Sequence, residues 1–295
     1  MRKLVPDRIL EVLREDTPRS KSPLRQLLGV VWANLKILTA YKSWLVMDLL
    51  STVASVLMYY FVGLQVDPLK LASSGWGMSY LAFSLIGVAT SNYLWSCLTR
   101  LSHSIQHEIR GGTLEAVAVS PVNMTIFFLG LTTRGYIVSS IYLIGVFAVG
   151  TIGLGASFST SLSSLSSFLL MFLLMLIANQ SLGLIAAGIV MVYKRGDPIT
   201  FIVAAMNEFL AGVLYPLEML KAFPALQMIS MMFPYTHALD GMRRSLILGA
   251  SLNDPNLLFD LVILLGFTVV MAPMGIAVLQ WGYRTIRFQG TTSSY

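Results

Sequence analysis

The residues of this chain with the most obvious capacity for chemistry lie in a polar stretch near its middle, residues 104–121 (SIQHEIRGGTLEAVAVSP). Two glutamates, an arginine and a histidine surround a glycine pair there, and long apolar runs flank the stretch on both sides. Neither a nucleophile with its base nor a metal-ligand spacing accompanies these residues, so catalysis is not indicated. A solvated helical loop and a docking surface for another protein are the two remaining interpretations.

A second set of polar residues falls inside long apolar runs. Arg134 and Glu208 each lie about ten residues into such a run, which corresponds to a depth of roughly 15 Å in a membrane, and Asn207 precedes Glu208. A charge at that depth costs at least about 3 kcal/mol unless it is paired or hydrated. We therefore expect Arg134 and Glu208 to face each other or to share a polar cavity. The alternatives are that Arg134 extends to the interface or that the pair is purely structural.

Metal and disulfide chemistry find little support in the sequence. The three histidines do not cluster, and Cys97 is the single cysteine, which excludes an internal disulfide. We predict no metal site and no catalytic residue in the chain.

The elements that must position these residues are membrane spans. Apolar residues make up 56% of the chain and charged residues 12%, against about 25% charged residues in soluble proteins. This composition predicts an all-α polytopic membrane protein. The first 42 residues are charged and do not resemble a cleavable signal.

Six transmembrane helices are predicted from runs near or above the 17–25 residues that cross a bilayer. They cover residues 44–66, 76–98, 124–154, 165–193, 198–215 and 257–281, and the fifth is the shortest. Nine Lys and Arg residues precede the first span and six more lie in links on the same side, against four on the other side. The positive-inside rule then places both termini in the cytoplasm, with the protein in the plasma or inner membrane.

Two further segments differ from spans. Residues 24–42 carry apolar side chains at helical spacing, which predicts an amphipathic helix on the inner membrane surface. Residues 217–256 are too apolar for a free outer loop and are interrupted by prolines, so re-entrant helices are predicted after the fifth span. Residues 1–23 are expected to form a mobile cytoplasmic arm and residues 43–295 a single transmembrane domain.

The polar stretch itself has helical character. Leu101, Ile105 and Ile109 follow one another at a spacing of four, which places them on one helix face. Gly111 and Gly112 interrupt this pattern.

The segment HEIRGGTLEAVAVSPVN resembles the cytoplasmic segment after the second span in type-2 ATP-binding-cassette (ABC) exporter permeases. The matching positions are Glu108, Arg110, Gly112, Thr113, Leu114, Glu115, Ser120 and Pro121. A later segment, AGVLYPLEMLKAFPALQMISMMFPYTHALDGMRR, is similar to the family's outer region at Gly212, Pro216, Pro224, Pro234, Thr236 and Arg243. The outer loop departs from the family in being short and apolar.

This resemblance implies a function and a set of partners. A pair of permeases, two copies of this chain or a heterodimer, would bind two copies of an ABC ATPase. The docking element would be a coupling helix that includes Glu108, Arg110, Gly112, Thr113, Leu114, Glu115 and Pro121. The outer gate would comprise Tyr215, Pro216, Pro224 and Pro234. Spans one, two and five would contact an amphipathic drug-like or lipid substrate.

The chain has no Gly-x-x-x-x-Gly-Lys-Ser/Thr motif, so ATP and Mg would be bound by the separate ATPase, and the chain itself is not expected to be an enzyme. Its expected partners are the ATPase, a second permease and the lipid bilayer, with no nucleic acid. Export of a polysaccharide or an ion by the same kind of permease remains an alternative. So do a non-transporting membrane scaffold and a membrane-embedded lipid-modifying enzyme, although no acidic or histidine cluster supports the enzyme.

Overall fold

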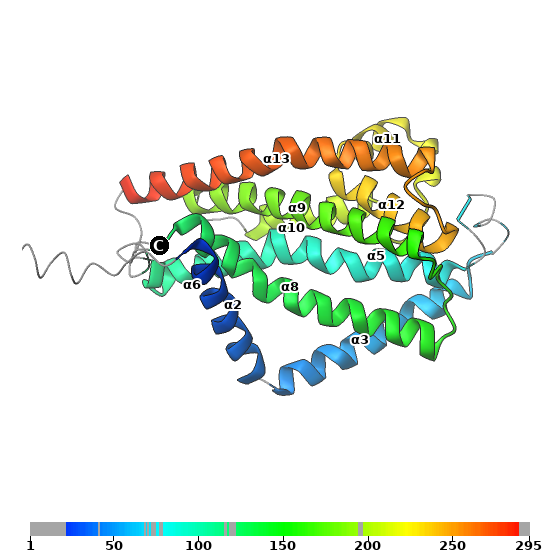
Figure 1. Ribbon diagram of the computed structural model, residues 1–295, viewed down its shortest axis with the longest axis horizontal. Coiled ribbons are helices and arrows are strands. Elements are labelled where there is room, and N and C mark those ends of the chain that lie inside the picture. Colours follow the sequence, from blue (N-terminus) through cyan, green and yellow to red (C-terminus); the bar gives the residue numbers. More distant parts are fainter. Residues whose placement is uncertain are drawn as a thin grey trace, which may run out of the picture.

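The chain forms a bundle of long helices that run side by side (Figure 1). In this computed structural model, all regular structure among the described residues is helical. The structure describes residues 22–40, 42–67, 69, 71, 75–76, 79–114, 117, 122–193 and 197–288. Residues 1–21 of the predicted arm (residues 1–23) lie outside these ranges, as do Glu115, Ser120, Pro121, Lys194 and Arg195.

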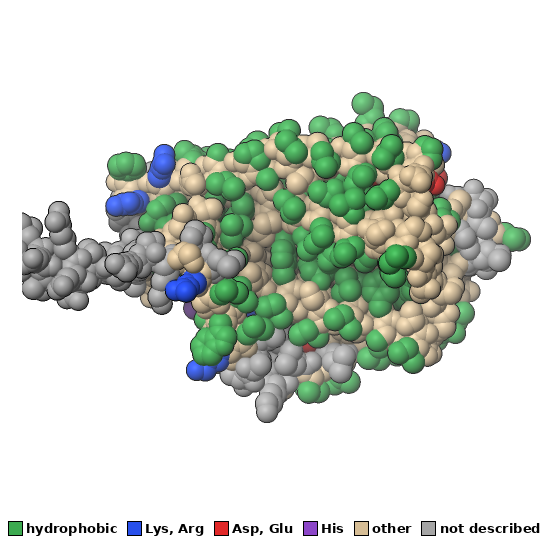
Figure 2. Space-filling view, in the orientation of Figure 1, with side chains coloured by type: hydrophobic (Ala, Val, Ile, Leu, Met, Phe, Trp, Pro, Cys, Tyr) green, Lys and Arg blue, Asp and Glu red, His purple; other side chains and the backbone are tan. Residues whose placement is uncertain are grey.

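Five helical segments are long and apolar enough to cross a membrane. They are α3 (Lys42–Gly63), the continuous run α5–η1–α6 (Tyr80–Arg110), α8 with η2 (Met124–Gly153), α9 (Leu162–Tyr193) and α13 (Pro255–Phe288). Figure 2 shows apolar side chains over most of the flank of this bundle, with Lys and Arg gathered at one end. These features are consistent with a multi-pass membrane protein.

The second predicted span differs from the structure in one respect. Residues 76–98 were expected to end before a separate polar helix, yet α5 (Tyr80–Trp95), η1 (Ser96–Arg100) and α6 (Leu101–Arg110) form one uninterrupted helix. Residues 96–100 adopt a π-helical turn, which keeps the chain helical where the sequence changes from apolar to polar.

The fifth predicted span is also different. Helix α10 covers Asp197–Leu210, and its 14 residues correspond to about 21 Å, less than the roughly 30 Å of a hydrocarbon core. Three short helices follow: η3 (Leu217–Ala222), α11 (Pro224–Met231) and α12 (Pro234–Leu248). The backbone at Gly212 has φ +66°, a left-handed conformation that glycine adopts readily, and it turns the chain away from α10.

Two ends of the bundle are distinguished below. The α6 end contains α6, the last turns of α13 and α2 (Pro23–Ala40), which crosses the bundle at a steep angle (Figure 1). The α12 end contains η3, α11 and α12. Helix α2 is fixed to α8, because the backbone amide of Asn123 donates to Gln26 Oε1 (3.1 Å) and Val30 packs directly on Gly130.

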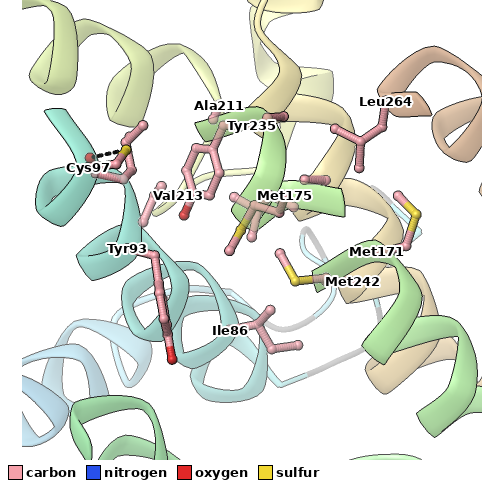
Figure 3. Packing of buried hydrophobic residues seen from close by; sticks show 14 of the residues in the cluster. Ile86, Tyr93, Cys97, Met171, Met175, Ala211, Val213, Tyr235, Met242 and Leu264 are labelled. Atoms are coloured by element: carbon pink, nitrogen blue, oxygen red, sulfur yellow. Dashed lines mark hydrogen bonds between the residues drawn. The ribbon is translucent and has the colours of Figure 1, made fainter. Parts of the chain in front are cut away.

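The largest buried cluster joins α5, α9 and α12 (Figure 3). Met171, Met175 and Met242 fill its centre beside Tyr235, and each of these side chains is fully buried. In lipid, where the surroundings are as apolar as the core, such contacts stabilise mainly through close packing. The contact between α9 and α13 shows this most directly, since a Cβ at Gly282 would overlap the backbone of Gly188.

Candidate functional sites

Helix α6 has one buried face and one exposed face. Leu101, Ile105 and Ile109 are almost completely buried, which confirms the stripe predicted from their spacing. They pack with residues of α8, α9 and α13, among them Phe128 and Met191. The tip of this helix is therefore anchored to three other helices rather than free in solvent.

The exposed end of α6 carries most of the predicted coupling residues that the structure describes. Arg110 donates to Gln106 Oε1 (3.1 Å), and the Thr113 hydroxyl contacts both the backbone carbonyl (3.2 Å) and the carboxylate of Glu108. Gly112 has φ +68° and ends the helix, as the glycine pair predicted. Leu114 returns to the buried cluster, so the turn is fixed at both sides.

At the α12 end, the three prolines of the predicted outer gate each lie at the start of a short helix. Pro216 precedes η3, Pro224 begins α11 and Pro234 begins α12. Proline suits these places because its fixed φ matches a helix and its missing N–H would have no partner there. Tyr215 donates from its hydroxyl to the Phe209 carbonyl (2.5 Å), which folds the loop back on α10.

Arg243 of α12 holds this region together. Its guanidinium is 2% exposed and donates to the carbonyls of Phe83 (3.2 Å), Gly212 (2.8 Å) and Val213 (2.6 Å). It also lies 3.5 Å above the centre of the Phe83 ring. A single side chain thus ties the loop after α10 to α5.

A charged cluster lies beside Arg243 and lines a cavity of about 240 Å³. His237 Nδ1 contacts Asp260 (2.8 Å) and His237 Nε2 contacts the Met231 carbonyl (3.1 Å). Both ring nitrogens therefore face acceptors, and only the protonated imidazole can donate to both. Arg244 in turn contacts Asp240 (2.7 Å) and Asp260 (3.7 Å).

These contacts shift the ionisation of the cluster. Burial lowers the pKa of His237, but the hydrogen bonds to Asp260 and Met231 outweigh it and raise the pKa above its ordinary value. Burial and the neighbouring Asp260 carboxylate raise the pKa of Asp240 to about 7, against the opposing charge of Arg244.

The structure does not bring Arg134 and Glu208 together. Both side chains are described, and no ion pair joins them among the described residues. Arg134 lines a cavity of about 320 Å³ between η1–α6 and α8, whereas Glu208 lines a cavity of about 310 Å³ on α10. The sequence places them at similar positions along two different helices, but it does not show which way either helix faces.

Glu208 has a different partner. Its carboxylate accepts from the Trp95 indole (2.7 Å), and Trp95 meets Phe201 edge to face at 5.3 Å between ring centres. Tyr59 of α3 lies near enough to Glu208 to interact with it electrostatically. Residues of α3, α5 and α10, the helices of the first, second and fifth predicted spans, thus converge on one carboxylate. The neighbouring Asn207 is completely buried, and neither atom of its amide has a hydrogen-bond partner among the described residues.

The network of His237, Asp240, Arg244 and Asp260 was not predicted. The sequence analysis counted Arg243 and Arg244 as loop charges, although Arg243 matched the outer family pattern. A signal was present in the four charged or ionisable residues within eight positions of an otherwise apolar segment, HALDGMRR.

Comparisons with known proteins add no assignment: no protein-family model matches the chain, and no curated protein matches its sequence. Function must therefore be inferred from residue patterns and geometry.

Proposed function

We propose that this chain is the membrane permease subunit of an ABC exporter. The observation that carries the proposal is the placement of the segment that resembles a coupling helix. Glu108, Arg110, Gly112 and Thr113 lie at the tip of α6, at the end of the bundle where Arg284 and Arg287 of α13 also lie. This is the side on which the positive-inside rule places the cytoplasm.

The proposed coupling uses the continuity of the helix. An ATPase that pushes on the tip of α6 acts on a single rod that runs through η1 into α5. The π-helical turn at residues 96–100 is the natural place for that rod to bend, because such turns interrupt the regular ladder of backbone hydrogen bonds. Alternating access then requires two states of the permease that the nucleotide-bound ATPase stabilises differently.

The six-span arrangement belongs to this proposal. Helix α10 alone is too short to cross, so we propose that the loop after it and the helices η3 and α11 complete the fifth passage as re-entrant elements. The ends of re-entrant helices must be shielded by protein, and Arg243 provides such shielding by donating to the carbonyls of Gly212 and Val213. Helix α2 would lie on the inner membrane surface.

The proposed substrate region surrounds Glu208. A carboxylate beside Trp95, Phe201 and Tyr59 suits an amphipathic substrate that carries a positive charge, because aromatic faces and a carboxylate both attract cations. The outer face of α10 presents Ile199, Phe201, Ile202, Met206 and Phe209, each more than half exposed. We propose that a second permease covers this face, so that the substrate path lies between the two chains.

The proposal is tested by co-purification with the ABC ATPase encoded beside this chain. Wild type is compared with Glu108→Ala/Glu115→Ala, and with Arg284→Ala/Arg287→Ala as a control at the same end of the bundle. ATPase that binds the wild type and the control but not the glutamate variant would support the coupling role. Binding that survives the glutamate change would move the docking site elsewhere.

Failure of any ATPase to bind under every nucleotide condition would favour the non-transporting scaffold. If the ATPase binds, export of a cationic amphiphile is measured in vesicles with the wild type and Glu208→Gln. Loss of that export in the variant supports the substrate region. A polysaccharide or an ion as the exported substrate would leave the permease assignment in place and exclude the amphipathic substrate.

A further inference from the structure

A cationic cavity lies at the α6 end, beside the π-helical turn at residues 96–100, and the proposed coupling assigns no ligand to it. It measures about 320 Å³ and lies between η1–α6 and α8. Arg100, His103 and Arg134 contribute to its lining, with Leu131 and Val138 providing apolar surface in the same wall. The cavity thus combines positive charge with hydrocarbon contacts, as a site for an anionic amphiphile would.

The positive charge of this cavity is only partly balanced by the residues that the structure describes. Among the described residues, Arg100 and Arg134 form no ion pair, and their two guanidinium groups repel each other. Asp48 of α3 acts on Arg100 through space and is the acidic group that offsets it in part. Two arginines against one partly buried carboxylate leave the site with a net positive charge.

An unsatisfied hydroxyl lies in the same wall. Ser96 is completely buried, its hydroxyl has no hydrogen-bond partner among the described residues, and it lines the cavity. Leaving a buried hydroxyl unpaired costs about 1–3 kcal/mol, so an acceptor supplied by a ligand would stabilise this arrangement. Gly135 faces Ser96, and a Cβ at that glycine would overlap the hydroxyl. The close approach of α8 to the π-helical turn therefore depends on glycine.

The depth of the cavity follows from α2. Val30 of this amphipathic helix packs on Gly130 of α8, and Arg134 follows Gly130 by one helical turn, or about 6 Å. With α2 on the membrane surface, Arg134 lies just below it, at the level of lipid headgroups. Its charge therefore does not need the deep pairing that the sequence alone suggested.

We propose that this cavity binds the phosphate group of an anionic phospholipid from the inner leaflet. The two guanidinium groups would donate to the phosphate oxygens, for which the planar fork of arginine is well suited, and the Ser96 hydroxyl would donate a further hydrogen bond. Val138, one helical turn deeper than Arg134, would contact the glycerol and the first methylene groups. This proposal concerns the chain in a bilayer and does not depend on the ATPase.

The test measures lipid retention by native mass spectrometry of the full chain in detergent. Phosphatidylglycerol is compared with phosphatidylcholine for the wild type, for Arg100→Gln/Arg134→Gln, and for Arg284→Gln/Arg287→Gln. The last variant removes the same charge from exposed positions at the same end of the bundle. We expect the cavity variant to bind phosphatidylglycerol about tenfold more weakly or worse, and the α13 variant to bind like the wild type.

Two further measurements keep the proposal falsifiable. Arg134→Lys retains the charge but not the planar fork of arginine. Its affinity for phosphatidylglycerol should therefore lie between those of the wild type and the double variant, and this comparison holds even if the double variant folds poorly. Binding of inorganic phosphate is measured in parallel, because a site for a soluble anion would bind phosphate without any preference between the two lipids. Equal loss of lipid in the cavity and α13 variants, or binding of phosphate without any lipid preference, would overturn the proposal.

Discussion

Two pairs of arginines, one pair at each end of the bundle, differ in how many of their hydrogen-bond donors have partners. At the α12 end, Arg243 donates to three carbonyls and Arg244 contacts two carboxylates. At the α6 end, Arg100 and Arg134 face a cavity with no ion pair among the described residues. An arginine whose N–H groups all have acceptors stabilises the fold, whereas an arginine without an ion-pair partner has N–H donors available for a ligand.

The largest effect on stability should come from replacing Arg243 at the α12 end. Arg243→Ala removes three buried hydrogen bonds from a charged donor. Each such bond contributes about 1.5–3 kcal/mol, so we expect a loss of about 3–5 kcal/mol in the free energy of unfolding. Denaturant titration in detergent measures this loss. Arg134→Ala serves as the matched control and should change stability by no more than about 0.5 kcal/mol. Equal effects of the two substitutions would contradict the contrast between the two ends.

A smaller effect should appear when the pH is varied. Asp240 ionises near 4 in the unfolded chain and near 7 in the folded one, so between these values the folded state retains a proton that the unfolded state has lost. His237 acts in the same direction, because its raised pKa gives stability that is present below about pH 6.5 and lost as the pH rises further. Stability should therefore fall by about 2–3 kcal/mol between pH 5 and pH 8.

Thermal unfolding across this pH range provides the measurement. In His237→Gln/Asp240→Asn the decline should largely disappear, since neither group can then exchange a proton. A decline of the same size in that variant would place its origin elsewhere in the molecule.

The smallest effect concerns Arg134 and Glu208. Because Arg134 and Glu208 line separate cavities, the stability changes of Arg134→Gln and Glu208→Gln should add to within about 0.3–0.5 kcal/mol in the double variant. Trp95→Phe combined with Glu208→Leu is the positive control, since each change removes the hydrogen bond that the two side chains share and their effects should not be additive. If the Trp95 and Glu208 changes were additive and the Arg134 and Glu208 changes were not, then Arg134 and Glu208 would interact after all.

Helix positions followed from the sequence where apolar length or spacing decided them. Five of the six predicted spans correspond to the five long apolar helices, and the stripe of Leu101, Ile105 and Ile109 is buried as its period indicated. The fifth span was predicted too long, because hydropathy does not register the turn at Gly212 that ends α10. The second span was predicted to end at residue 98 because polar residues follow, but a helix continues through polar residues when its other face stays buried.

Side-chain partners were harder to predict. The pairing of Arg134 with Glu208 was inferred from depth alone, and depth does not determine which way a helix faces. The contacts of Arg243 with Phe83, Gly212 and Val213 join residues that lie far apart in the sequence. No local pattern contains such contacts, because they follow from how the helices pack.

The length of the run from α5 to α6 has a further consequence. Its 31 residues extend about 46 Å, which exceeds the roughly 30 Å of a hydrocarbon core by about 15 Å. Helices α9 and α13, with 32 and 34 residues, are at least as long. The ends of these three helices would together project beyond the hydrocarbon core at the α6 end of the bundle. A partner bound to these helix ends would lie about 15 Å from the hydrocarbon core. A small tilt of the helices at that end would produce a larger displacement at the opposite membrane face.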